Sequence, residues 1–344
     1  MPSKNQTYLH RFALFTAICT FCLIIAGGLV TSTGSGLAVP DWPLSYGQLM
    51  PSMVGGILYE HSHRMVAAFV GFLAVILAVW LWKSKEPRWV RVLGFIALAA
   101  VVLQGLLGGL TVLFMLPTAI SVSHAALAQT FFCIVAAVAL FTSRWWRSEQ
   151  PQLNETHASP TTLTLSIFMT AAVFVQLILG ALMRHTDAGL AVPDFPLAYG
   201  QVFPSLSQES IAAYNARLIH DHVRLAADGP ISSGQVVLHM AHRSWAAAVA
   251  LLILWTSVRL WKLSSSGKRL RNFSYLLVVL LAVQIGLGWT TVISRKAVDI
   301  TTAHVAVGAL LLVSSVVTAL HLWRYCGLRV VRFPFVTARK EAVA

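Results

Sequence analysis

The sequence predicts an all-α integral membrane protein with eight transmembrane helices in two pseudo-symmetric four-helix bundles. Hydrophobic residues make up 57% of its 344 residues, and Asp, Glu, Lys and Arg only 11%, whereas a soluble domain carries about a quarter charged residues. The apolar residues lie in long runs, and about 20 such residues cross the hydrocarbon core of a membrane. Several motifs also occur twice. Because backbone groups in lipid must be satisfied internally, we expect the runs to be helices.

The expected helices fall into two groups of four. The first group covers residues 12–31, 56–82, 89–114 and 118–143, and the second covers residues 162–183, 235–261, 273–293 and 298–323. We therefore divide the chain into an N-terminal half, a polar linker without a folded unit, a C-terminal half and a tail, at residues 1–147, 148–161, 162–326 and 327–344.

The formal charge of +13 would suggest nucleic-acid binding in a soluble protein. Its distribution predicts a membrane orientation instead, because cytoplasmic segments carry an excess of Lys and Arg. With the N-terminus inside, most basic residues fall in cytoplasmic segments, and the outer segments hold Arg184, Arg217, Arg224, Arg295 and Lys296. We expect both termini in the cytoplasm, contact with membrane lipid and no nucleic-acid partner.

The N-terminal segment predicts a bacterial cell inner membrane. The first apolar run is longer than a signal-peptide core and lacks a small-residue cleavage site, and residues 1–11 are shorter than a typical transit peptide. The cysteines lie within or at the inner ends of helices, so we expect no outward-facing disulfide. Cys19-x-x-Cys22 lies inside an apolar run, where packing is the better interpretation than a redox pair.

The two halves repeat a loop motif and several single residues. Gly-Leu-Ala-Val-Pro-Asp at residues 36–41 returns at residues 189–194, an offset of 153. The offset becomes 179 between His63 and His242, and 180 between His124 and His304. This step places an insertion near residues 206–233, to which the sequence assigns no role. Parallel repeats predict an axis along the membrane normal.

Four of the twelve histidines lie inside the expected helices. His63, His124, His242 and His304 each lie about six to eight residues from the outer helix end, or roughly 9–12 Å deep at 1.5 Å per residue. An intramembrane histidine is costly and indicates a functional site. We interpret His61 as interfacial, and the remaining histidines in loops and at helix ends as ordinary surface residues: His10, His157, His185, His220, His222 and His321.

Two pairs of histidines at one depth predict that haem is held between them. Facing imidazoles in a helical bundle can bind the iron of a flat macrocycle from both sides. Zinc would require three or four ligands at one site, and only Glu60 or His239 lies nearby in the sequence. Haem iron is therefore the expected metal for His63 with His124, and for His242 with His304.

The halves differ one helical turn before the first histidine of each pair. Glu60 precedes His63 by three residues, and the corresponding residue in the second half is His239. A carboxyl group beside a haem can act as a base or stabilise charge, which predicts a catalytic first half and a cofactor-holding second half. The alternative is that Glu60 only pairs with Arg64. Arg64 and Arg243 are candidate contacts for haem propionates.

With these residues in place, the chain resembles the haem A synthase family over nearly its whole length. The resemblance rests on the duplicated eight-helix plan, the two Gly-Leu-x-x-Pro-Asp-aromatic-Pro loops, Glu60-x-x-His63-Arg64, His124, His242-Arg243 and His304. It implies oxidation of the C8 methyl group of haem O to a formyl group, giving haem A for terminal oxidases. The partners implied are haem O synthase and an unidentified electron donor or acceptor.

The resemblance also implies a role for each candidate residue. His242 and His304 would hold a permanent haem b, His63 and His124 would bracket the substrate haem, and Glu60 would be the essential acid. Many bacterial members have cysteines in the first outer loop, whereas residues 40–47 contain none. A mechanism that needs a loop disulfide is therefore not carried over.

Two other functions remain as alternatives. A di-haem electron-transfer cytochrome b would need the four histidines but no carboxylate in one pocket. A transporter built on parallel repeats would have broken helices and ionisable residues at the membrane midplane. The polar residues of this sequence gather near the outer leaflet instead, which disfavours transport.

Overall fold

The structure is a computed structural model that describes residues 4–148, 160–223, 229–263 and 268–326. Eight of its helices are long and apolar enough to cross a membrane: α1 (Lys4–Ser32), α2 (Gly55–Lys83), α3 (Arg88–Leu113), α4 (Thr118–Phe141), α6 (Pro160–His185), α8 (Ser233–Lys262), α9 (Lys268–Ile293) and α10 (Val298–Tyr325). The predicted all-α membrane fold with eight spans is confirmed. Residues 149–159 of the expected linker and 327–344 of the expected tail lie outside the described residues.

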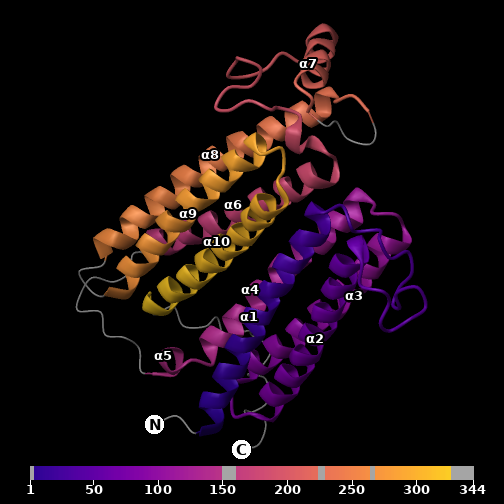
Figure 1. Ribbon diagram of the computed structural model, residues 1–344. Helices are drawn as coiled ribbons and strands as arrows, with labels where there is room; N and C mark the ends of the chain where they lie inside the picture. Colours follow the sequence, from indigo (N-terminus) through magenta and orange to yellow (C-terminus); the bar gives the residue numbers. More distant parts are fainter. Residues whose placement is uncertain (1–3, 149–159, 224–228, 264–267, 327–344) are drawn as a thin grey trace, which may run out of the picture.

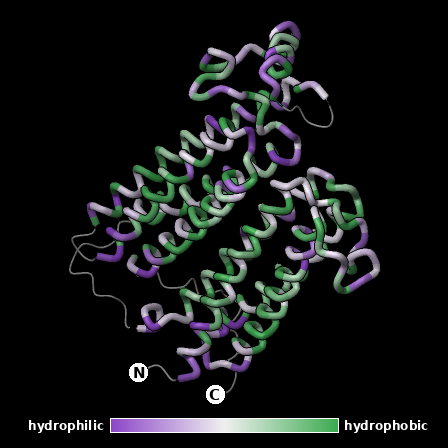
Figure 2. Tube along the Cα trace, in the orientation of Figure 1, coloured by the Kyte–Doolittle hydropathy of each residue, from purple (hydrophilic) through white to green (hydrophobic). Residues whose placement is uncertain are grey.

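Two helices begin at least five residues earlier than the apolar runs that predicted them. α1 starts at Lys4 rather than at residue 12, and α9 starts at Lys268 rather than at residue 273. Both extensions are rich in polar and basic residues, and Figure 2 shows hydrophilic residues at the helix ends beside a hydrophobic middle. Long cationic side chains can keep their charge in water while the helix continues, so the hydropathy pattern ends before the helix does.

The helices pack in the same order in both halves (Figure 1). In the first half, α1 packs against α2 and α4, and α3 lies between α2 and α4. In the second half, α6 packs against α8 and α10, and α9 lies between α8 and α10. The halves meet where α1 and α4 contact α10 and where α4 contacts α6. Each half has its own apolar core, and Ala309 of α10 joins the core of the first half.

A short helix, α5 (Arg144–Arg147), follows α4 and brings an aromatic side chain to the second half. Trp145 stacks on His321 of α10, with ring centroids 4.1 Å apart, and the guanidinium carbon of Arg269 lies 4.5 Å from the Trp145 centroid. His321 is 4% exposed. The prediction that His321 is an ordinary surface residue is wrong, because the rings of Trp145 and Phe273 pack against it. The prediction that the linker from residue 148 contains no folded unit concerns residues that are mostly outside the described ones.

The insertion near residues 206–233 contains a helix, α7 (Gln208–His220), which covers the second repeated loop. That loop includes a 3₁₀ turn, η1 (Ala188–Leu190). Tyr214 of α7 stacks on Tyr199 of the loop with ring centroids 3.6 Å apart. Leu218 and Val192 are buried in the same small apolar cluster. Figure 1 shows α7 beyond the end of α8, away from the helical bundle.

Candidate functional site

The four predicted histidines lie within the first three turns of α2, α4, α8 and α10. His63 is close enough to His124 for an electrostatic interaction between the imidazoles, and His242 is similarly close to His304. The fold therefore brings together the histidines of each predicted pair, from two helices of one half. The depth argument from the sequence, which depends on these helices starting at the same membrane face, stays a prediction.

A glycine on the adjacent helix lies against each of these imidazoles. A Cβ atom added to Gly27 or Gly108 would lie 3.1 Å from Cε1 of His63 or His124. The same addition to Gly180 or Gly288 would lie 3.3 Å from Cε1 of His242 and 3.1 Å from Cε1 of His304. Contacts this short would force the imidazole to shift. Glycine at these four positions therefore leaves the space in which each imidazole ring lies.

Glutamines accompany three of the four histidines. Gln104 Nε2 lies 3.3 Å from Nε2 of His124, and Gln284 Nε2 lies 3.4 Å from Nε2 of His304. Gln176 Nε2 lies 3.2 Å from both ring nitrogens of His242. At an offset of 153, the residue that corresponds to Gln176 in the first half is Leu23. The ring of His63 therefore has an apolar residue at the repeat position where His242 has a glutamine.

The chemistry of the histidine pairs fits haem. Nδ1 of His63, His124 and His304 is buried without a hydrogen-bond partner, which is costly unless the ring serves another purpose. No three His, Cys, Asp or Glu side chains of the described residues are grouped as a bare metal ion would require. Two imidazoles per half are a ligand set that would hold haem iron. When bound, haem would supply redox chemistry at iron between the rings of each pair.

Glu60 is buried beside the first pair, with 3% of its surface exposed. Its Oε2 accepts a hydrogen bond from the Val39 backbone N–H at 2.9 Å, and its Oε1 lies 2.6 Å from Nη2 of Arg64. The ion pair that the sequence offered as an alternative role therefore exists. It does not exclude a catalytic role, because a carboxylate held on two sides is well oriented toward a neighbouring group.

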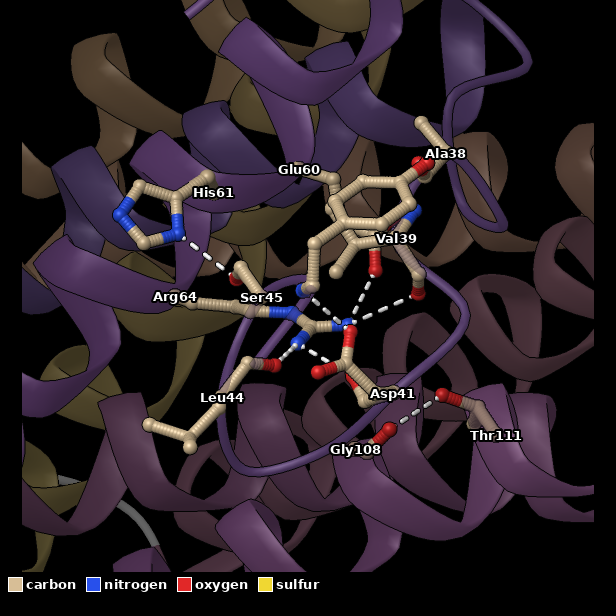
Figure 3. Close-up of polar contacts among 11 residues, drawn as sticks. Ala38, Val39, Asp41, Leu44, Ser45, Glu60, His61, Arg64, Gly108 and Thr111 are labelled. Atoms are coloured by element: carbon tan, nitrogen blue, oxygen red, sulfur yellow. Dashed lines mark hydrogen bonds and ion pairs between the residues drawn. The ribbon is translucent and has the colours of Figure 1, made fainter. Parts of the chain in front are cut away.

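Arg64 binds the first repeated loop (Figure 3). Its Nη1 donates to the carbonyl oxygens of Asp41 and Leu44, at 2.7 and 2.8 Å. Its Nη2 donates to the carbonyl oxygen of Val39 at 3.2 Å and to Glu60. These four bonds use all four hydrogens of the terminal nitrogens. Only the Nε–H of Arg64 is left to donate to a haem propionate, the contact that the sequence predicted.

Arg243 binds the second loop in the same manner. Its guanidinium donates to the carbonyl oxygens of Val192, Asp194 and Leu197, at 3.0, 2.7 and 3.2 Å. These are the repeat positions of the three carbonyls that Arg64 contacts. The histidine–arginine dipeptide thus connects a ring inside the bundle to the loop above it.

An aspartate closes each loop on itself. Asp41 accepts hydrogen bonds from the N–H groups of Gly47 and Tyr46, at 2.8 and 2.6 Å, and Asp194 accepts the matching pair from Gly200 and Tyr199. The N–H of Gly47, then that of Tyr46, holds the pKa of Asp41 below its ordinary value. Tyr46 and Tyr199 have positive φ angles of 54° and 52°, a conformation that these hydrogen bonds help to maintain.

Two other histidines are buried beside the pairs. His61 is 5% exposed and its Nδ1 lies 2.8 Å from Oγ of Ser45, so it contacts the first loop. His239 is 2% exposed and its Nδ1 lies 2.9 Å from the carbonyl oxygen of Ala188.

Cys19 and Cys22 form no disulfide. His157 lies outside the described residues.

Several site residues escaped sequence reasoning. The offset of 153 pairs Gly27 with Gly180 and could have identified both. Gln176 has no repeat partner, so the duplication gave no signal for it. Arg184 was predicted only as one of the basic residues of the outer segments.

Comparison with known proteins identifies the family of this chain. The sequence model of the COX15-CtaA family, described as cytochrome oxidase assembly protein, matches residues 10–54 and 54–316. The haem A synthase of Alkalihalophilus pseudofirmus is 32% identical over 214 residues, which cover 61% of this chain and 71% of that protein. The haem A synthase of Halalkalibacterium halodurans is 28% identical over 315 residues, or 88% and 94% of the two chains. The chain belongs to the COX15-CtaA family of cytochrome oxidase assembly proteins, together with these haem A synthases.

Proposed function

We propose that this protein is a haem A synthase that oxidises the C8 methyl group of haem O to a formyl group. The observation that carries the proposal is that two pairs of histidines lie at corresponding positions of the two halves, but among the described residues only the first pair has a buried carboxylate, Glu60, one helical turn away. Family membership and the haem A synthases among the relatives support this activity.

The reaction removes four electrons from the methyl carbon. If water supplies the oxygen atom, a methyl group and one water give a formyl group, four protons and four electrons. Two C–H bonds are lost and one C=O bond forms. Glu60, one turn from His63, is placed to stabilise developing positive charge and to accept a proton. His63 and His124 would orient the substrate haem.

The second half would hold haem b permanently on His242 and His304. Gln176 supports this assignment, because its amide lies within 3.2 Å of the ring nitrogens of His242, and a half-turn of the amide would let its oxygen accept a hydrogen bond from the ring N–H that does not bind iron. A hydrogen-bonded ligand keeps its ring orientation better than a free one. His63 has Leu23 at the corresponding position, which suits a site whose haem must enter and leave. The cover formed by α7 over the second loop suits the same assignment.

The activity can be tested directly. The protein is expressed with a source of haem O, and the extracted haems are separated by chromatography. Accumulation of haem A, with none in the absence of the protein, is expected. A di-haem electron-transfer cytochrome would bind haem without changing the haem O pool. Transport is disfavoured because α1–α4, α6 and α8–α10 each run unbroken across their spans.

The Gln176→Leu variant should release haem b about fivefold faster than the unmodified protein. One hydrogen bond to a buried ring contributes about 1 kcal/mol, which corresponds to this factor. Transfer of haem to an excess of apomyoglobin measures the rate. Gln104→Leu, which removes the matching glutamine from the first half, is the control and should leave that rate unchanged. Equal rates for Gln176→Leu and the unmodified protein would remove this support for the assignment of the halves.

We also propose that the protein lies in a bacterial inner membrane with both termini in the cytoplasm. The basic residues support this orientation. An alkaline phosphatase reporter fused after Arg147 or at the C-terminus should be inactive, and one fused at Ser207 should be active. Activity at either of the first two positions would overturn the orientation. In this topology the histidine pairs open toward the periplasm, where haem O synthase and an electron acceptor are the proposed partners.

A further inference from the structure

Arg184 occupies a distinctive place near the outer end of α6. It follows Gly180 by four residues, so the two lie on one face of the helix, one turn apart, and Gly180 is the glycine that contacts the ring of His242. Arg184 is also close enough to His304 for an electrostatic interaction. The guanidinium therefore lies at the outer end of the second histidine pair.

The same side chain reaches across to the first half. Its Nη2 donates to the carbonyl oxygen of Gly28 at 3.1 Å and to Oγ of Ser32, both on α1. Ser32 in turn accepts a hydrogen bond from Thr302 of α10 at 3.1 Å. Gly28 adjoins Gly27, which contacts the ring of His63. Arg184 thus places a positive charge between the two histidine pairs.

The charge of Arg184 lacks a counter-ion in the part of the chain that the structure describes. No carboxylate there lies within ion-pair distance of it. Both of its described acceptors are neutral and both use Nη2, which leaves the hydrogens of Nε and Nη1 for another acceptor. The end of the α6 dipole favours a cation but does not supply that acceptor. A partly buried guanidinium in this setting is suited to bind an anion.

The other arginines near the histidines are differently placed. Arg64 and Arg243 give their terminal nitrogens to loop carbonyls. The residue that corresponds to Arg184 in the first half is the neutral Thr31. At this repeat position, therefore, only the second half carries a positive charge. The carboxylates of a bound haem favour the polar end of a membrane site, which is the end where Arg184 lies.

We propose that Arg184 binds a carboxylate, namely a propionate of the haem that His242 and His304 hold. This inference rests on the proposed function, because it needs haem in the second half. A charge-assisted hydrogen bond from Nε or Nη1 to a carboxylate oxygen would hold the propionate side of the haem against α6. A phosphate group of an outer-leaflet lipid is the other anion with suitable chemistry.

Haem and its dimethyl ester distinguish these two anions. The full-length protein carries His63→Ala and His124→Ala, so that the second half alone binds, and is produced in haem-deficient cells. Membranes are then titrated with haem b or with haem b dimethyl ester, whose propionates are neutral. We expect the ester to bind at least about tenfold more weakly than haem b, and Arg184→Gln to weaken haem b binding by a similar factor without affecting the ester. Arg184→Lys, which keeps the charge but not the planar fork, should lie between.

Lys296→Gln is the matched control, because it removes a positive charge at the same end of the second half, where Lys296 pairs with Asp187 at 3.8 Å. It should leave both affinities unchanged. If Arg184→Gln weakens haem b and the ester equally, the anion is a lipid phosphate or the effect is structural, and the proposal is wrong. If haem b and ester bind equally to the unmodified second half, the proposal is also wrong although haem binding stands. If haem b does not bind the second half at all, the proposed function itself fails there.

Discussion

The Glu60→Gln variant is expected to form haem A at least about a hundredfold more slowly while binding haem near normally. Oxidation of a ring methyl group draws positive charge onto carbon and releases protons. A carboxylate in a low-dielectric pocket can stabilise this charge and accept a proton, an effect worth a few kcal/mol or about 10²–10³ in rate. Glutamine keeps the size and the hydrogen-bonding ability of the side chain but removes the negative charge and the base. Chromatography of extracted haems measures the yield, and absorbance measures bound haem.

The structure sharpens what must be controlled in this experiment. Glu60 also orders the first loop through the Val39 N–H and Arg64, so a loss of activity can arise from a displaced loop. Glu60→Asp keeps the charge on a shorter arm and should retain intermediate activity. Arg64→Gln breaks the ion pair but keeps the carboxylate. If its activity falls as far as that of Glu60→Gln, the ion pair rather than the free carboxylate carries the effect.

A second buried carboxylate provides the matched control. Glu86 is 6% exposed and lies 2.8 Å from Nη2 of Arg147, at the opposite end of the bundle from the histidine pairs. Glu86→Gln therefore removes a buried, arginine-paired carboxylate from the same protein without touching the site. It should lower thermal stability more than haem A yield. A near-normal yield from Glu60→Gln would leave Glu60 as a structural partner of Arg64.

The sequence contained enough information for the spans and the histidine pairs. Hydropathy is summed over about 20 residues per span, so one atypical residue does not change the prediction of a helix. Each of the eight predicted spans corresponds to a helix of the structure. The pairing of His63 with His124 depended on the internal repeat, because two copies of one pattern identify helices that start at the same face. Glycines near the histidine pairs can be seen in the sequence. Their contacts with the imidazoles, as at Gly108 and Gly288, depend on how the helices pack and could not be predicted.

Other features depend on contacts between segments far apart in the chain. Whether Arg64 faces a haem propionate or a loop depends on where the carbonyls of residues 39–44 lie, and no local pattern fixes that. His321 was interpreted as a surface residue because it lies at a helix end, but Trp145 covers it from a segment 176 residues away. The insertion near residues 206–233 had no repeat partner, so its helix α7 and its packing on Tyr199 could not be predicted from the duplication.

Replacing His242 or His304 by Ala is expected to remove most of the low-spin b-type absorbance of the purified protein. Two imidazoles would hold the iron of the proposed haem, so the loss of either would leave one protein ligand in place of two and change the spin state of the iron. The haem would also lose one of its two attachments to the helices α8 and α10. His63→Ala should leave most of this absorbance in place, because in the proposed function the first half holds its haem only during turnover. Absorbance and electron paramagnetic resonance spectra of the purified variants measure the change.

His239→Ala is the matched control for His242→Ala. His239 is also a buried histidine of α8, one turn away, but its Nδ1 lies against the carbonyl oxygen of Ala188 rather than facing His304. If burial of a histidine in α8 merely stabilises the bundle, both variants should lose haem alike. If His242 is the ligand, its variant alone should lose the signal, and added imidazole should restore part of it by occupying the space left by the side chain. Survival of the b-type spectrum with both His242 and His304 replaced would show that the permanent haem is held elsewhere, and the assignment of the two halves would have to be reversed.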